Sequence, residues 1–168
     1  KNSGTKITDE VDNTAKKVKP GISYTKNDAK ITLIGVKDKP GVASEIFKPL
    51  KDINLDMIVQ TSSPNGGETD ITFTIKKEDI KKSINLLKKN KKISYEKIFQ
   101  NDKVSKVSVV GAGMITQPGV AQKFFNALAK KRINIMVIST SEIKISVLID
   151  QQHTNKAVKL LHKEFDLE

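Results

Sequence analysis

The pattern of apolar and polar residues along this 168-residue chain occurs twice. An apolar stretch at 31–36 leads into Pro40-Gly41, then a helical pattern, then a second apolar stretch at 53–59. The same order returns after Val107, with Pro118-Gly119 at the turn. Such self-similarity indicates two copies of one small module. Because a unit of about 70 residues has a marginal core of its own, we expect the copies to pack on each other or on a second chain.

The first copy predicts four strands and two helices. Period-2 alternation and turn residues indicate strands at 31–36, 55–62, 69–75 and 94–99, and the 3.6-residue period indicates helices at 42–50 and 78–89. The residues Pro64-Asn-Gly-Gly67 are typical of a turn and predict a hairpin. The resulting order, βαββαβ, is the split-βαβ arrangement of an antiparallel sheet with helices on one face.

The second copy lacks its fourth strand. Its pattern predicts strands at 104–110, 135–140 and 143–149 and helices at 120–131 and 154–165. The remaining segment of strand composition is 21–25, which precedes the first copy. We infer that it completes the second sheet, so that the first module is inserted into the second; the alternative is an unpaired N-terminal arm. The predicted fold class is α+β, with two ferredoxin-like modules.

The net charge of +11 makes nucleic-acid binding a candidate function, because lysine and arginine clusters bind phosphate backbones. However, Arg132 is the only arginine among the 30 basic residues, and aromatic residues are few. Bidentate contacts to phosphate or guanine and stacking platforms are therefore scarce. The lysines between Lys76 and Lys92 fall on the polar face of the helix predicted at 78–89, which is typical of a solvated surface. We therefore expect no nucleic-acid partner.

The inventory of reactive groups argues against catalysis by this chain. Cysteine is absent, which excludes disulfides and thiolate metal sites and suits a reducing cytoplasm. His153 and His162 lack metal-ligand spacing, and Gly111-Ala-Gly113 lacks the third glycine of a dinucleotide fingerprint. No apolar run reaches the roughly 20 residues that span a bilayer. We expect a cytoplasmic chain with no metal, no membrane contact and no catalytic residues.

Several segments of the chain form a distinctive set: Gly21-Ile-Ser-Tyr24, Ile34-Gly-Val-Lys-Asp-Lys-Pro-Gly41, Gln60, Thr69-Asp-Ile-Thr-Phe73, Lys106-Val-Ser-Val-Val-Gly-Ala-Gly-Met114, Pro118-Gly-Val120 and Ile138-Ser-Thr-Ser-Glu-Ile-Lys-Ile-Ser-Val147. Together they resemble the tandem ACT domains of the regulatory half of aspartate kinase, and the resemblance covers Gly21 to Leu167 with few gaps. Gly4-Thr-Lys-Ile7 resembles the last strand of the kinase domain. The resemblance implies that residues 1–18 end that domain and form a linker. It also implies a first ACT module at 30–99 and a second formed by 19–27 with 103–168.

The resemblance also implies a function. Aspartate kinase converts ATP and L-aspartate to 4-phospho-L-aspartate, and its ACT domains bind lysine, threonine or both for feedback inhibition. ATP and Mg²⁺ belong to the kinase domain, so this chain is expected to need no cofactor and to be inactive alone, as an excised piece of a longer enzyme. A homodimer through the ACT modules is expected, with the kinase domain as a further partner. The alternative is a stand-alone tandem ACT sensor that regulates another protein or a nucleic acid.

The candidate effector residues follow from the strand-to-helix turn of the first module. Between Asp38 and Ala43 the chain starts a helix and offers free N–H groups to an α-carboxylate. Asn54, Leu55 and Asp56 open the next strand, where carbonyls and the Asp56 carboxylate can take an ammonium group. Alternatively, Asp38 caps the turn and Asp56 is an ordinary edge carboxylate.

The full predicted effector set spans both modules. The first module supplies Asp38, Pro40, Gly41, Val42, Ala43, Asn54, Leu55, Asp56, Gln60 and Ser63. By resemblance, the second module of a partner chain forms the far wall with Ala121, Gln122, Asn134, Ile135, Thr140, Ser141 and Glu142. The second module has Met136 where the first has Asp56, so it is expected to hold no complete site of its own.

Overall fold

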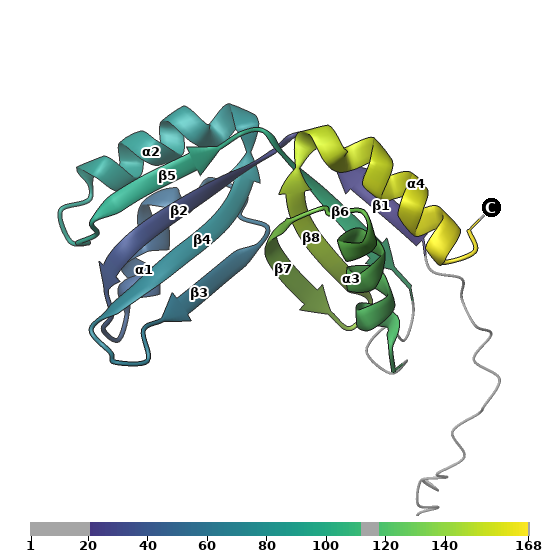
Figure 1. The fold of residues 1–168 in the computed structure, drawn as a ribbon. Coiled ribbons are helices and arrows are strands. Elements are labelled where there is room, and N and C mark those ends of the chain that lie inside the picture. Colours follow the sequence, from purple (N-terminus) through teal and green to yellow (C-terminus); the bar gives the residue numbers. More distant parts are fainter. Residues whose placement is uncertain (1–20, 112–117, 168) are drawn as a thin grey trace, which may run out of the picture.

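The protein forms two four-stranded antiparallel sheets in a computed structural model that describes residues 21–111 and 118–167 (Figure 1). The first module contains β2 (Asp28–Lys37), α1 (Val42–Phe47), a 3₁₀ turn (Lys48–Leu50), β3 (Ile58–Ser62), β4 (Glu68–Lys76), a 3₁₀ turn (Lys77–Asp79), α2 (Ile80–Lys89) and β5 (Lys97–Asn101). The second contains β1 (Gly21–Thr25), β6 (Val104–Val110), α3 (Val120–Lys130), β7 (Ile135–Ser141), β8 (Lys144–Asp150), a 3₁₀ turn (Gln151–His153) and α4 (Thr154–Glu164).

The strand order confirms that the first module is inserted into the second. One sheet has the order β3-β4-β2-β5 and the other has β1-β6-β8-β7. β1 pairs with β6 along its whole length, from Gly21 opposite Val110 to Thr25 opposite Lys106. β1 therefore supplies the fourth strand of the second sheet. The predicted kinase-domain end and linker at residues 1–18 lie outside the described residues.

Each module buries one face of its sheet under its own two helices. In the first module Ile31 and Leu33 of β2 are fully buried, whereas Thr32 between them faces the side without helices, as expected for a strand buried on one face. The equivalent pair in the second module is Val107 and Val109 of β6. A third apolar cluster joins the modules through Met57, Val59, Val104, Met136, Val137 and Leu148. The separate cores match the two modules predicted from the repeat.

The predicted helix at 42–50 is correct only for its first part. The α-helix ends at Phe47 and continues as a 3₁₀ turn that contains Pro49. Proline has no N–H to donate to the carbonyl of Glu45, four residues earlier. The side-chain amide of Asn90, just after α2, donates to this carbonyl instead, at 2.8 Å. The hydrogen bond from Asn90 therefore gives the Glu45 carbonyl the partner that Pro49 cannot supply.

Two strand boundaries also differ from prediction. β3 begins at Ile58 rather than residue 55, although pairing with β4 continues irregularly, because Thr74 N donates to Met57 O. β5 spans Lys97–Asn101 rather than 94–99, and β2 carries an irregularity between Leu33 and Val36. Local irregularities of this kind depend on the pairing partners and not on the period of the single strand.

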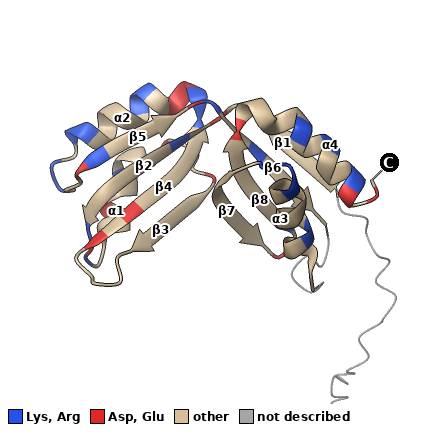
Figure 2. Cartoon of the chain, viewed as in Figure 1, with Lys and Arg blue, Asp and Glu red and all other residues tan. Residues whose placement is uncertain are grey.

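Positive charge lies on the outer sides of both modules. Figure 2 shows lysines spread over α2, α3 and α4, so that both modules carry positive charge. None of the helices in the described ranges has the length and apolar character needed to cross a bilayer.

Candidate functional site

A cavity at the start of α1 brings together six of the predicted effector residues. It has a volume of about 490 Å³, is open to solvent and is lined by Asp38, Lys39, Pro40, Gly41, Val42, Ala43 and Gln60. Lys39 is the one lining residue that was not predicted from the sequence. Lys39 could have been predicted as a lining residue, because it lies between Asp38 and Pro40 in the same turn. Effector binding by these residues stays a prediction.

The turn is shaped by a few backbone bonds and one glycine. Asp38 N donates to Gly67 O at 2.9 Å, which ties the end of β2 to the β3–β4 hairpin. Gly41 has φ 87°, in the left-handed region that glycine enters without steric cost. Gly119, at the same place in the second module, also has φ 87°. In both modules the glycine of the Pro-Gly pair therefore provides the left-handed backbone conformation that the turn requires.

The first turn of α1 presents an unpaired amide to the cavity. Val42 N donates to Lys39 O at 3.1 Å and Glu45 N to Gly41 O at 3.0 Å. Among the described residues, Ala43 N, which lines this cavity, donates to no backbone carbonyl, and neither does Ser44 N, which lines the adjoining pocket. Free amides at a helix start suit a carboxylate or another small anion.

Gln60 reaches the cavity because of the register of β3. It pairs with Ile71 of β4, whose side chain is buried in the core under α1. Directly opposed residues point to the same face of a sheet, so the Gln60 side chain lies on the helix-covered side. As β3 is an edge strand, Gln60 is also exposed there.

The structure does not bring Asp56 to this cavity, and the predicted pairing of Asp56 with the Asp38 turn is wrong. Asp56 N bonds Thr74 O near the end of β4, whereas Asp38 N bonds Gly67 O just before β4 begins. Seven residues of extended chain separate these points by roughly 23 Å. The Asp56 carboxylate instead forms an ion pair with Lys106 of the second module.

Three other first-module predictions also fall outside the cavity. Asn54 is exposed in the loop before β3, and Leu55 packs on the core of the first module. Ser63 lines a separate cavity of about 490 Å³ at the hairpin end, together with Lys37, Glu68, Tyr95 and Glu96. The structure therefore divides the first-module set between the turn cavity, the hairpin end and the junction with the second module.

The second-module residues form two exposed groups. Ala121 and Gln122 lie in the first turn of α3, while Thr140, Ser141 and Glu142 lie at the end of β7 and in the turn after it. Asn134 precedes β7, and Ile135 packs on the core of its own module. None of them lines the turn cavity of the same chain. Their predicted role in a partner's site stays a prediction.

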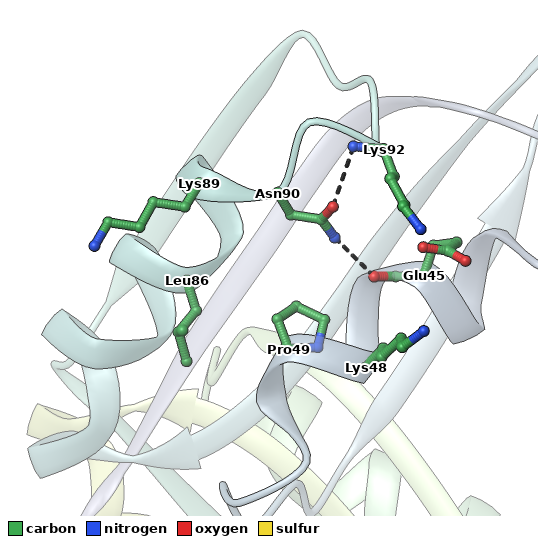
Figure 3. A pocket seen from close by; sticks show the side chains of 7 residues that line it. All are labelled: Glu45, Lys48, Pro49, Leu86, Lys89, Asn90 and Lys92. Carbon is green, nitrogen blue, oxygen red and sulfur yellow. Dashed lines mark hydrogen bonds between the residues drawn. The ribbon is translucent and has the colours of Figure 1, made fainter.

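A second groove lies between α1 and α2 (Figure 3). It has a volume of about 330 Å³ and is lined by Glu45, Lys48, Pro49, Leu86, Lys89, Asn90 and Lys92. Asn90 crosses it, donating to Glu45 O at 2.8 Å and accepting from Lys92 N at 3.1 Å. Lysines at helix C-termini are expected from the helix dipole alone. The groove therefore has a structural explanation that needs no ligand.

The described residues contain no group of three or more His, Asp or Glu side chains placed to hold a metal ion. Within residues 21–111 and 118–167, the titratable group with a clear pKa shift is Lys76. The hydrogen bond from Lys76 to Asp28 raises the pKa of Lys76 above its ordinary value of 10.5.

Comparison with known proteins gives the family. Residues 31–90 and 107–165 match the ACT domain model. The chain is 44% identical over 151 residues to the aspartokinase of Corynebacterium efficiens, covering 88% of this chain and 36% of that protein. The chain thus spans about a third of the length of that relative.

Two solved structures have the same fold over most of this chain. The regulatory subunit of aspartate kinase from Thermus thermophilus is 33% identical, with a TM-score of 0.82 over 89% of this chain and 99% of that one. A chain of a structure described as aspartokinase alpha and beta subunits is 45% identical, with a TM-score of 0.80 over 87% of this chain and 97% of that one. This chain therefore belongs to the ACT-domain family and carries the tandem ACT unit that the regulatory regions of aspartate kinases share.

Proposed function

We propose that this chain is the amino-acid-sensing regulatory region of an aspartate kinase, the enzyme that forms 4-phospho-L-aspartate from ATP and L-aspartate. The proposal is supported by relatives named aspartokinase and by a regulatory subunit of which this chain covers 99%. The observation that carries it is the turn cavity, where the unpaired Ala43 amide, the Asp38 carboxylate and the Gln60 side-chain amide meet.

The ligand of the turn cavity is an α-amino acid in this proposal. Its carboxylate binds the free amide of Ala43, as at other helix starts. Its ammonium group binds Asp38, the only carboxylate among the lining residues. Asp38 thus takes the role that the sequence analysis gave to Asp56. Gln60 binds the remaining polar group of the ligand.

Between the two expected effectors, the cavity favours threonine over lysine. Lys39 is an exposed lining residue, and its ammonium group would repel the second ammonium group of a lysine ligand. The threonine side chain carries no charge and can hydrogen-bond with the Gln60 amide.

The open side of the cavity is closed by a second chain in this proposal. The second-module residues that the resemblance assigns to the far wall are exposed at the start of α3 and at the end of β7. A dimer that places them over the neighbour's turn cavity would bury the ligand between two modules. Effector binding and dimer formation would then be linked.

Calorimetric titration of the 168-residue chain with each of the twenty amino acids tests the proposal. We expect threonine to bind, and Asp38→Asn to weaken binding by about 2 to 5 kcal/mol, because the ammonium group loses its charged partner. Asp52→Asn is the matched control, since Asp52 is exposed in the same module and does not line the cavity. Equal affinities of both variants and the parent chain for threonine would place the ligand elsewhere.

A second measurement distinguishes the proposed kinase regulatory region from the alternative, a stand-alone sensor. We expect the chain, joined to or mixed with a catalytic aspartate kinase domain, to make phosphoryl transfer sensitive to threonine. Insensitivity of the reconstituted kinase, with threonine binding intact, would favour the alternative.

A further inference from the structure

The two modules are joined by one continuous two-stranded ribbon. β1 and β2 follow each other in the chain but lie in different sheets, and so do β5 and β6 (Figure 1). Thr25 pairs with Lys106 and Lys30 pairs with Asn101, so five residues separate these pairs on both strands and the register is unbroken. Any change in the angle between the sheets must therefore bend or twist this ribbon at residues 26–29 and 102–105.

A cluster of four charges lies at this joint. Asp28 is the first residue of β2, and its side chain is 3% exposed. Lys76 donates to Asp28 Oδ1 at 2.8 Å, and Lys106 Nζ lies 3.8 Å from Asp28 Oδ2. Lys106 also forms the ion pair with Asp56. Two carboxylates are thus matched by two ammonium groups.

Lys106 is the only member of this cluster that belongs to the second module. Asp28, Asp56 and Lys76 all lie in the first module, whereas Lys106 lies in β6. Among the described residues Asp28 Oδ2 has no hydrogen-bond partner, and the Lys106 ammonium group 3.8 Å away is a compensating charge for it. A buried carboxylate is strongly disfavoured without such a charge.

The apolar cluster between the modules lies beside Lys106. Leu148 is directly opposite Lys106 on β8, and Val104 is two residues before it on β6, so all three side chains lie on one face of the sheet. Met57 of the first module follows Asp56 and packs in the same cluster. Opening the joint would therefore expose apolar surface at the same time as it moves Lys106 away from the two carboxylates.

We propose that Lys106 acts as a latch between the two modules, its ammonium group held by Asp28 and Asp56 so that the two sheets keep one relative angle. The buried Asp28 gives the latch its strength, because separation leaves that carboxylate with Lys76 alone. Asp56 is 41% exposed, so its contact with Lys106 contributes less than the contact of the buried Asp28 does. The latch does not depend on which amino acid the turn cavity binds.

Site-directed labelling can measure the angle directly, because the chain contains no cysteine. Asn85→Cys on α2 and Lys159→Cys on α4 place one spin label on an exposed helix position of each module. In the 168-residue chain we expect a single narrow distance distribution by pulsed electron paramagnetic resonance. Lys106→Met should add longer distances to this distribution, because the two sheets can then adopt other relative angles.

Lys30→Met is the matched control. Lys30 lies on β2 in the same ribbon and is half-buried, and it forms no ion pair within the described residues. We expect its distance distribution to equal that of the parent chain. Asp56→Asn should give an intermediate broadening, since Lys106 then keeps only Asp28.

The outcome that would overturn the latch is an unchanged distance distribution in folded Lys106→Met and in Asp56→Asn. If Lys106→Met does not fold, the distance distribution of Asp56→Asn alone tests the proposal. This variant should fold, because an exposed carboxylate can be replaced without loss of the core. An equally broad distribution in Lys30→Met would also contradict the proposal, since the effect would then belong to any lysine of the ribbon.

Discussion

At the residue scale, Gly41 holds the turn cavity in shape through its backbone conformation. A Cβ added at Gly41 would meet nothing within 4 Å, so the effect of a side chain there is confined to its positive φ. We expect Gly41→Ala to lower the free energy of unfolding by about 1 to 2 kcal/mol, measured by denaturant titration. Gly21→Ala is the control, because a Cβ there also meets nothing within 4 Å and no positive φ is required. Equal stabilities of the two variants would contradict this account.

Lys76 is a second single residue with a testable effect, because its contribution to the stability of the folded chain depends on pH. Its hydrogen bond to Asp28 raises the pKa of Lys76 above 10.5, so the folded chain holds this proton more tightly than the unfolded chain does. The stabilisation is therefore complete below the ordinary pKa and is lost as the pH rises through the raised one. We expect the stability difference between the parent chain and Lys76→Met to be constant from pH 8 to about pH 10 and to shrink above it. A difference that grows with pH in this range would show the opposite linkage.

At the scale of elements, Asn90 connects the two helices of the first module. It replaces the hydrogen bond that Pro49 cannot make to the carbonyl of Glu45. We expect Asn90→Ala to lower the unfolding free energy by about 1 to 2 kcal/mol, because the carbonyl of Glu45 loses its partner. Asn85→Ala is the control, since Asn85 is an exposed residue of α2. Thermal unfolding of both variants measures the difference, and a larger loss for Asn85→Ala would contradict the explanation.

At the scale of the whole molecule, the sheet edges favour association of two chains. Each of the four edge strands exposes one large apolar side chain, namely Tyr24 on β1, Ile58 on β3, Phe99 on β5 and Ile138 on β7. Exposed edges with apolar residues favour pairing with another chain. We expect sedimentation to give about twice the mass of 18.6 kDa.

A substitution at one edge tests this association. Ile138→Lys should shift the sedimenting species toward the monomer, because a charge on an edge strand opposes pairing. Ile143→Lys is the control, since Ile143 is 56% exposed but lies in the turn between β7 and β8. A monomer in the parent chain, with and without threonine, would rule out the dimer.

The amino-acid sequence by itself determined the two modules and their elements. Strand alternation, helical period and Pro-Gly turns depend on neighbours a few residues apart, so they can be read along the chain. The second module lacked a fourth strand, and Gly21–Thr25 was the remaining segment of strand composition. β1 occupies that place in the second sheet. The cavity at Asp38–Ala43 was also predictable, because the residues of one turn must lie together.

Only the tertiary structure decided which charges meet. Asp56 and Lys106 are 50 residues apart in sequence, and Asp28 and Lys76 are 48 apart, so no local pattern relates them. Their contacts depend on how two sheets are set on one ribbon, which is a property of packing between modules. The same packing removed Asp56 from the predicted effector site and placed it at the joint. Local spacing fixes the elements of this protein, whereas long-range burial and charge pairing fix how its two modules are held together.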